Sequence, residues 1–334
     1  MRGQSRRQVL RGGLALAGIS LLAGCSVLPR QVSPTSKITR IGYLSLGSAS
    51  DPAFDAFRQG LVDLGYIEGQ NLVVEYRIVE AGSDQLAAFA AELAQLPVDI
   101  IVARGTPPIL AAKNATSTIP VVFGAANDPV GAGFVTSLAS PGANVTGSSA
   151  LTYELGGKRL ELLKQAAPSS SRVALLAHQD DHSLEPSQGI LQDAAHRLGF
   201  ELHTLVVRGP EDVGPAFQAA AAQHADALLV VPGPIILTYR PGIVAQAAAQ
   251  RLPAIYYSRD FVTAGGLMAY GANTLVLWRR LATTVDKILK GAKPSDVPVE
   301  QATMFDFFIN LKAAQALGLT IPQSVLQQAT EVIQ

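Results

Sequence analysis

Short apolar runs with the length of a β-strand alternate with amphipathic segments of helical length along almost the whole chain. Residues 98–103 form a nearly continuous apolar run, which is typical of a strand in a parallel sheet covered on both faces. Residues 83–96 instead repeat their apolar side chains at helical spacing. Alternation of this kind predicts α/β architecture with parallel sheets and right-handed crossovers.

The alternation falls into two series of similar length. In the first series we predict strands at 40–45, 72–78, 98–103 and 119–124, and helices at 51–64, 83–96 and 107–114. In the second we predict strands at 172–177, 200–207, 227–231 and 254–257, and helices at 153–166, 184–198, 211–224 and 235–250. We therefore expect two doubly wound, Rossmann-like domains joined by a hinge, with the join near residues 145–151.

The C-terminal part contains more elements than two simple halves need. Its pattern predicts a strand at 265–271, a helix at 273–289, an extended stretch at 294–301, a strand at 305–310 and a helix at 311–317. We expect this tail to cross back between the domains, adding a helix to the first and a strand to the second. The predicted domains are 38–150 plus about 272–300, and 151–271 plus about 301–334.

The N-terminus carries an export pattern. A short apolar stretch at 14–23 ends in small residues before the chain's single cysteine, Cys25, and no acidic residue precedes it. A basic start and a short apolar core describe a secretory signal rather than a bilayer span of about 20 residues. The basic residues are Arg2, Arg6, Arg7 and Arg11.

The run Leu22-Ala23-Gly24-Cys25 resembles the bacterial lipoprotein signal, in which the cysteine is lipidated after cleavage. We predict a signal peptide at 1–24, lipidation of Cys25 and a flexible linker at 25–37, with the folded part held at a membrane outside the cytoplasm, in the periplasm. An ordinary signal peptide that happens to contain a cysteine is the alternative. Residues 5–10 resemble a twin-arginine signal, although Val9 stands where phenylalanine is usual, so both export routes stay open.

Charge and cysteine content exclude several classes of function. The whole chain has a formal net charge of zero, and loss of the four N-terminal arginines would leave it slightly acidic. A slightly acidic chain without basic clusters does not fit a nucleic-acid binder. Lipidation of the only cysteine would also remove disulfides, thiolate zinc sites and cysteine nucleophiles.

Small and polar residues follow the predicted strands, where open α/β sheets bind their ligands. These segments are 46–48, 104–106 and 126–129 in the first half, and 178–181, 232–234 and 258–261 in the second. If the two rims face each other across a hinge, they form a cleft that can close on a small molecule. The candidate ligand-binding residues are Gly47, Ser48, Thr106, Asn127, Asp128, His178, Asp180, Pro232, Gly233, Ser258, Arg259 and Phe261.

Each candidate also has a purely structural explanation. Thr106 and Ser48 could cap helices, and Asp128 with its following proline could initiate a turn. The stretch 178–182 holds two histidines and two aspartates and is the most metal-like in the chain, but no other histidine cluster supports it. We interpret that stretch as a polar rim and expect neither a metal nor a cofactor.

Enzyme motifs fail on inspection. The pair Gly131 and Gly133 lacks the third glycine of a dinucleotide-binding fingerprint, and neither a P-loop nor a GxSxG elbow occurs. We therefore expect no enzyme.

Several segments together resemble one known family, the ABC transporter substrate-binding proteins of the tryptophan/tyrosine type, which have the type I periplasmic-binding-protein fold. The resemblance extends from about residue 38 to the C-terminus. It rests on residues 41–45, 57–61, 64–71, 112–123, 128–131, 141–147, 158–163, 264–271 and 288–294.

The resemblance implies a receptor that captures a small organic solute and delivers it to an ABC permease with its ATPase. Some relatives are associated with aromatic amino acids. Carried over, Ser48 and Thr106 would receive the carboxylate, Asp128 the ammonium group, and Tyr153 or Phe261 the apolar side chain. The loop at 178–182 departs from an Asn-Pro-Asp-Asn-like sequence in many relatives, which leaves the ligand open.

We expect a monomer that binds a small molecule, is attached to the membrane through its lipid anchor, and binds no nucleic acid. A lipid-anchored sensor of the same fold, passing ligand occupancy to a signalling receptor, is the alternative. An extracytoplasmic hydrolase is a third and weaker one.

Overall fold

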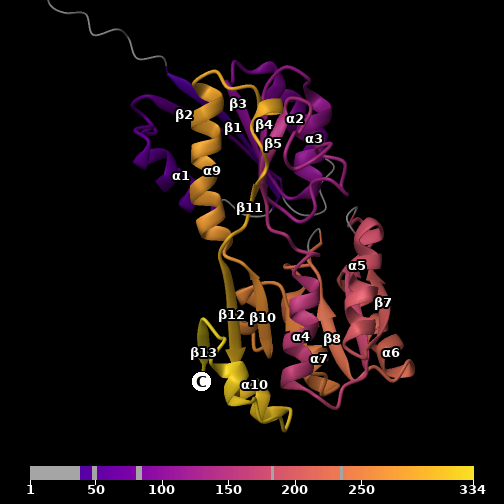
Figure 1. Ribbon diagram of the computed structural model, residues 1–334. Coiled ribbons are helices and arrows are strands. Elements are labelled where there is room, and N and C mark those ends of the chain that lie inside the picture. Colours follow the sequence, from indigo (N-terminus) through magenta and orange to yellow (C-terminus); the bar gives the residue numbers. More distant parts are fainter. Residues whose placement is uncertain (1–37, 47–50, 80–84, 182–183, 234–235) are drawn as a thin grey trace, which may run out of the picture. The chain divides into compact units, whose positions relative to one another are not determined.

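The computed structural model describes residues 38–46, 51–79, 85–181, 184–233 and 236–334 (Figure 1). The predicted signal peptide, Cys25 and the linker at 25–37 lie outside these residues, as do Gly47 and Ser48. Within the described ranges, no helix combines the length and the hydropathy needed to cross a bilayer.

The first sheet is parallel throughout, in the order β11-β5-β4-β3-β1-β2. Successive residues of a strand point to opposite faces of the sheet. Strands that are apolar at successive positions therefore make both faces apolar. Its strands are β1 (Thr39–Leu46), β2 (Leu72–Val79), β3 (Ile100–Arg104), β4 (Val121–Ala126), β5 (Val145–Ser149) and β11 (Glu300–Gln301).

Helices bury both faces of this sheet. Helices α1 (Pro52–Asp63) and α9 (Thr274–Leu289) pack on the side of Ile100 and Val102. Helices α2 (Leu86–Gln95) and α3 (Thr106–Ala115) pack on the side of Ile101 and Ala103. This two-sided burial explains why the strand at 98–103 is apolar at nearly every position.

The second sheet has the order β13-β12-β10-β9-β8-β6-β7; β12 pairs antiparallel with β10, so β12 and β13 run opposite to the other five strands. Helices α4, α5, α10 and α11 contribute to one core, and α6, α7 and α8 to the other. The strands are β6 (Arg172–His178), β7 (Glu201–Val207), β8 (Ala227–Val230), β9 (Ala254–Tyr256), β10 (Met268–Ala272), β12 (Phe305–Asn310) and β13 (Glu331–Ile333). The helices are α4 (Gly156–Ala166), α5 (Leu184–Arg197), α6 (Val213–Ala222), α7 (Arg240–Ala249), α8 (Arg259–Thr263), α10 (Leu311–Ala316) and α11 (Gln323–Leu326), with one-turn 3₁₀ helices at Pro210–Asp212 and Pro294–Asp296.

The predicted fold class is confirmed, with two α/β parallel-sheet domains. Local signals at the first helix also hold. The Asp51 side chain accepts a hydrogen bond from the Ala53 N–H, Pro52 is the first helical residue, and Gly65 follows the helix at φ +88°. An L-residue would be strained at that φ, which is why a glycine ends this helix.

Some elements were not predicted from the sequence. Strand β5 was predicted only as a join, because its sequence Val-Thr-Gly-Ser-Ser is small and polar. It is nevertheless fully buried, and its polar side chains find backbone partners. Thr146 Oγ1 donates to the Val297 carbonyl at 2.7 Å, and Ser148 Oγ accepts from the Ala125 N–H at 2.9 Å.

Other boundaries were also wrong. Helix α4 begins at Gly156, so Tyr153 belongs to the turn before it, and α7 begins at Arg240 instead of residue 235. Residues 259–263 form the short helix α8 instead of a loop, and α11 and β13 were not predicted. These elements are short and carry too few residues for a periodic pattern.

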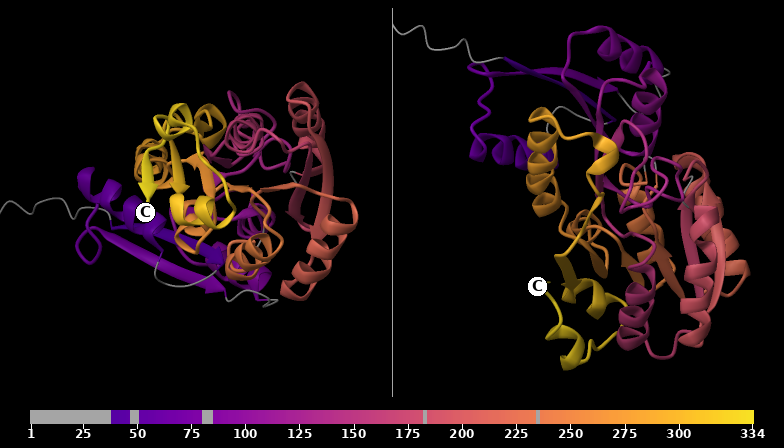
Figure 2. Two further views of the ribbon diagram at one scale, coloured as in Figure 1. Left: turned by 90° about the horizontal axis from the view of Figure 1, so that it is seen from below. Right: turned by 45° about the horizontal axis from the view of Figure 1, so that its top comes forward.

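The chain passes three times from one sheet to the other. The first crossover follows β5, the second lies between β10 and α9, and the third lies between β11 and β12. Between the last two, α9 packs beside α1 and β11 pairs with β5 before the chain returns to β12 (Figures 1 and 2). The residue boundaries of the two domains stay predictions.

Helix α9 docks through Trp278, the only tryptophan of the chain. Its indole is 1% exposed and lies against Gly124 in the middle of β4, where a Cβ atom would overlap the ring. Gly124 is therefore a packing requirement of the C-terminal helix.

We predict that Gly124→Ala lowers the free energy of unfolding by about 1–3 kcal/mol, the usual cost of overpacking a core. The matched control is Gly189→Ala in α5, where a Cβ atom would meet nothing within 4 Å. That control should gain about 0.5–1 kcal/mol from helix propensity. Urea unfolding followed by Trp278 fluorescence measures both. Equal stability of the Gly124→Ala protein and the wild type would contradict this packing.

Candidate ligand-binding site

Both sheets contain a topological switch point. In the first sheet β1 lies between β2 and β3, and in the second β6 lies between β7 and β8. The chain moves outward on one side of each central strand and then reverses to the other side. The crevice outside the carboxyl ends of two such strands is where open α/β sheets bind ligands.

At the β1/β3 switch point, a buried carboxylate holds a half-exposed guanidinium. Asp51 is 7% exposed, and its Oδ2 accepts from the Tyr43 hydroxyl at 3.0 Å. The same oxygen lies 2.9 Å from Nη1 of Arg104, the last residue of β3, whose side chain is 38% exposed. One carboxylate thus caps α1, fixes a tyrosine and orients an arginine.

Thr106 is the first helical residue of α3 and therefore not its N-cap. The N-cap is Gly105, at φ +91°, which has no side chain to cap the helix. The two helical residues after Thr106 are Pro107 and Pro108, which have no N–H. The start of α3 therefore offers an anion fewer backbone donors than most helix starts.

At the β6/β8 switch point, His178 and Gly233 touch. A Cβ atom on Gly233 would lie 2.7 Å from the Cβ of His178, so only glycine fits there. His178 is 2% exposed; its Nδ1 accepts from the Asp180 N–H at 3.1 Å, and its Nε2 donates to the Arg208 carbonyl at 3.2 Å. This pattern defines a neutral imidazole that supports the loop.

Both ring nitrogens of His178 are therefore in use. Among the residues that the structure describes, no three potential metal ligands gather. His182, the second histidine of the predicted metal-like stretch, lies outside them. Asp180 is exposed and Pro232 is buried.

The first crossover brings together residues of both series. Thr152 donates through its hydroxyl to Asn127 Oδ1 at 3.0 Å, and its N–H donates to the Asn127 carbonyl. The next residue, Tyr153, is 1% exposed and donates its hydroxyl hydrogen bond to Asp181, in the loop after β6. Tyr153 is thus a buried link between the crossover and the second switch point.

Asp128 has a structural role as well as a candidate one. Its Oδ1 accepts from the Gly131 N–H at 2.8 Å, which is the turn that the Asp-Pro sequence predicted as the alternative. Glu154 lies near it and was missed, since a lone glutamate carries no sequence signal. Glu154 is exposed overall, but partial desolvation of its carboxyl group raises its pKa; a backbone hydrogen bond acts against the rise, and the charge of Asp128 adds to it.

The residues after β9 make contacts within the second domain. Ser258 Oγ caps α8 by accepting from the Asp260 N–H, and Arg259 Nη2 lies 2.7 Å from Glu331 Oε1 on β13. Phe261 is fully buried and stacks on Tyr256 at 4.6 Å between ring centroids. The structure therefore places Phe261 in the core instead of at the rim, and Tyr153 is buried in the other core of that domain.

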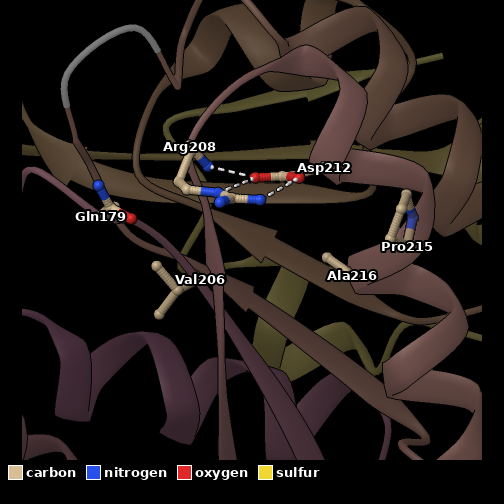
Figure 3. A pocket seen from close by; sticks show the side chains of 6 residues that line it. All are labelled: Gln179, Val206, Arg208, Asp212, Pro215 and Ala216. Carbon is tan, nitrogen blue, oxygen red and sulfur yellow. Dashed lines mark hydrogen bonds and ion pairs between the residues drawn. The ribbon is translucent and has the colours of Figure 1, made fainter.

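A separate hollow of about 360 Å³ lies beside the edge strand β7. Its lining residues are Gln179, Val206, Arg208, Asp212, Pro215 and Ala216 (Figure 3). The Arg208–Asp212 ion pair, 2.9 Å between Nε and Oδ2, occupies its wall, and Arg208 is largely exposed. None of the sequence-predicted ligand residues lines this hollow, so the switch points remain the candidate site.

Comparison with known proteins agrees with this architecture. The family model described as "ABC transporter substrate binding protein" matches residues 44–333, so the chain belongs to that family. The family consists of binding proteins that work outside the cytoplasm with ABC transporters.

Individual relatives match over almost their whole length. A tyrosine-binding protein of Clostridioides difficile is 26% identical over 313 residues, covering 90% of this chain and 89% of that protein. A conserved domain protein from Vibrio cholerae superposes with a TM-score of 0.81 at 29% identity, covering 89% of this chain and 100% of that one. A Streptococcus pneumoniae ABC domain in complex with L-Trp superposes with a TM-score of 0.80 at 27% identity, covering 88% and 100%.

The tyrosines of this protein make its stability sensitive to high pH. Burial is the largest cause that raises the pKa of each of the eight tyrosines, to about 12 for Tyr66 and Tyr76. The carboxylates of Asp51 and Asp181 add to the rise at Tyr43 and Tyr153. The native protein therefore keeps phenolic protons that the unfolded chain loses near pH 10.

We predict that the free energy of unfolding falls steeply as pH rises above about 10, because the unfolded state then binds fewer protons. Arg159 opposes this trend, since burial lowers its pKa to about 10, but it is a single group. Melting temperature from pH 8 to 11.5, with tyrosinate absorbance at 295 nm, measures the effect. Tyrosine titration near pH 10 in the folded protein, without loss of stability, would contradict it.

Proposed function

We propose that this protein is the substrate-binding component of an ABC importer for an α-amino acid, with aromatic amino acids as the first candidates. Relatives that bind tyrosine and L-Trp match this chain over nearly its full length and support the proposal. The structural observation that carries it is a cation and an anion at the carboxyl ends of neighbouring strands: Arg104 is the last residue of β3, and Asp128 follows β4, which pairs with β3. A zwitterionic amino acid needs a partner of each sign.

We assign the ammonium group of the ligand to the carboxylates of Asp128 and Glu154. Two neighbouring carboxylates repel each other, and a cation between them relieves that repulsion. Asp128 accepts from the Gly131 N–H through Oδ1, and a carboxylate can accept several hydrogen bonds, so this contact is compatible with an ammonium ligand.

The proposed activity is capture and release without chemistry. Ligand affinity for a closed arrangement drives closure, and the ligand is passed unchanged to the permease and its ATPase. We further propose that the mature protein begins at Cys25, carries a lipid there, and works as a periplasmic monomer held near its permease. A lipid anchor suits this role because it keeps the receptor close to the transporter.

A thermal-shift and calorimetric screen tests the proposal directly. The purified protein is titrated with tyrosine, tryptophan, phenylalanine, leucine and aspartate, and with glucose and citrate as ligands of other classes. A specific ligand at 100 times its dissociation constant should add about 2.7 kcal/mol of stability. If no amino acid shifts the melting temperature while another class does, the amino-acid proposal is wrong.

We predict that Asp128→Asn weakens amino-acid binding by about 10- to 100-fold, equivalent to about 1.4–2.8 kcal/mol. Asparagine keeps an oxygen for the Gly131 N–H, so the melting temperature of the unliganded protein should change little. Asp63→Asn is the matched control, because that carboxylate pairs with Arg279 on α9 and lies away from the switch points. Unchanged affinity in Asp128→Asn would remove Asp128 from the site.

A further inference from the structure

Arg104 stands out among the charged residues because of where its strand ends. It is the last residue of β3, and its register partners are Ser45 of β1 and Gly124 of β4. Strands β1 and β3 flank the switch point of the first sheet. Arg104 therefore lies at the edge of the sheet where open α/β folds bind their ligands.

One ion pair holds the side chain of Arg104 in place and involves only one of its nitrogens. Asp51 contacts Nη1 at 2.9 Å and is itself fixed by the Tyr43 hydroxyl and the Ala53 N–H. A guanidinium has five N–H donors, and this contact uses one nitrogen. With 38% of the side chain exposed, a second oxyanion can approach it.

Other donors near this switch point are few. The start of α3 has prolines at 107 and 108, so of residues 106–108 only Thr106 has a backbone N–H. The N-terminus of α3 therefore has few N–H groups with which to bind a carboxylate, as helix N-termini usually can. Charge for an anionic group has to come from a side chain, and Arg104 is the cation at this position.

The field of Arg104 also reaches the second domain. Burial and Asp260 raise the pKa of Tyr257, which follows β9, and Arg159, Arg240 and Arg104 act against that rise. Arg104 thus lies within electrostatic reach of the carboxyl end of a strand in the other sheet.

We propose that Arg104 is the carboxylate anchor of the site and restricts its ligands to small molecules with a free carboxylate. This inference rests on the proposed amino-acid function. Arginine suits the role because its planar fork pairs with both oxygens of a carboxylate, which a lysine ammonium does not match. Asp51 sets the direction of the fork, and Thr106 adds a neutral donor.

The test compares amino acids with the amines that lack only the carboxylate. Calorimetry measures tyrosine against tyramine, tryptophan against tryptamine, and phenylalanine against phenethylamine, for wild type, Arg104→Gln and Arg104→Lys. The wild type should prefer the amino acid by at least about 100-fold, because loss of a desolvated charge pair is costly. Arg104→Gln should lose that preference while binding the amine within about threefold of wild type.

Two controls separate this role from a structural one. Arg104→Lys keeps the charge beside Asp51 and protects the fold, and it should weaken amino-acid binding about tenfold with little effect on the amine. Arg279→Gln removes an arginine–carboxylate pair at a distant position on α9 and should leave the preference unchanged. Melting temperatures identify any variant that is unfolded.

The outcomes distinguish the two proposals. Suppose that the wild type binds an amino acid, and that Arg104→Gln either weakens the binding of amino acid and amine equally or weakens neither. The assignment of Arg104 is then overturned, and the proposed function stands. If the wild type binds no amino acid, the proposed function and the assignment of Arg104 are both wrong. Loss of the preference in Arg104→Gln and its partial retention in Arg104→Lys support the assignment.

Discussion

The guanidinium of Arg159 joins the first crossover to strand β10, which leads into the second crossover. Arg159 lies in the first turn of α4 and is 1% exposed. Its Nη1 donates to the Thr152 carbonyl in the first crossover at 2.8 Å, and its Nε donates to the Tyr270 carbonyl near the end of β10 at 2.7 Å. Burial opposes the charge and lowers its pKa to about 10, so these charge-assisted hydrogen bonds offset a real desolvation cost.

Backbone bonds complete the link to the third crossover. The Asn273 N–H donates to the Met304 carbonyl at 2.9 Å, which ties the second crossover to the third. The Ala302 N–H donates to the Ser149 carbonyl at 3.0 Å, which ties the third to the first. The candidate site begins immediately beside this network, because Thr152 binds Asn127 and Tyr153 binds Asp181. The geometry of the site therefore depends on how the crossovers are held, and residues that never contact a ligand can affect affinity.

Sequence reasoning predicted what depends on local pattern and missed what depends on tertiary partners. The strand–helix alternation and the Asp51 cap follow from residue spacing and residue type, so both were predictable. Strand β5 was not, because its polar residues are buried only when Val297 and Ala125 supply partners. The same limit applies to the site. The roles of Ser258 as the cap of α8 and of Phe261 in stacking on Tyr256 could not be read from the sequence. The interest of Arg104 and Glu154 likewise comes from neighbours that are distant in sequence.

We propose that an amino acid binds with its carboxylate at Arg104 and its ammonium group at Asp128 and Glu154. A crystal structure of the protein with a bound aromatic amino acid is the decisive measurement. We expect carboxylate oxygens within hydrogen-bond distance, about 2.7–2.9 Å, of the Arg104 guanidinium. We also expect the ligand nitrogen beside Asp128. A ligand bound in the hollow beside β7, or bound at the switch points with its carboxylate turned away from Arg104, would contradict this proposal.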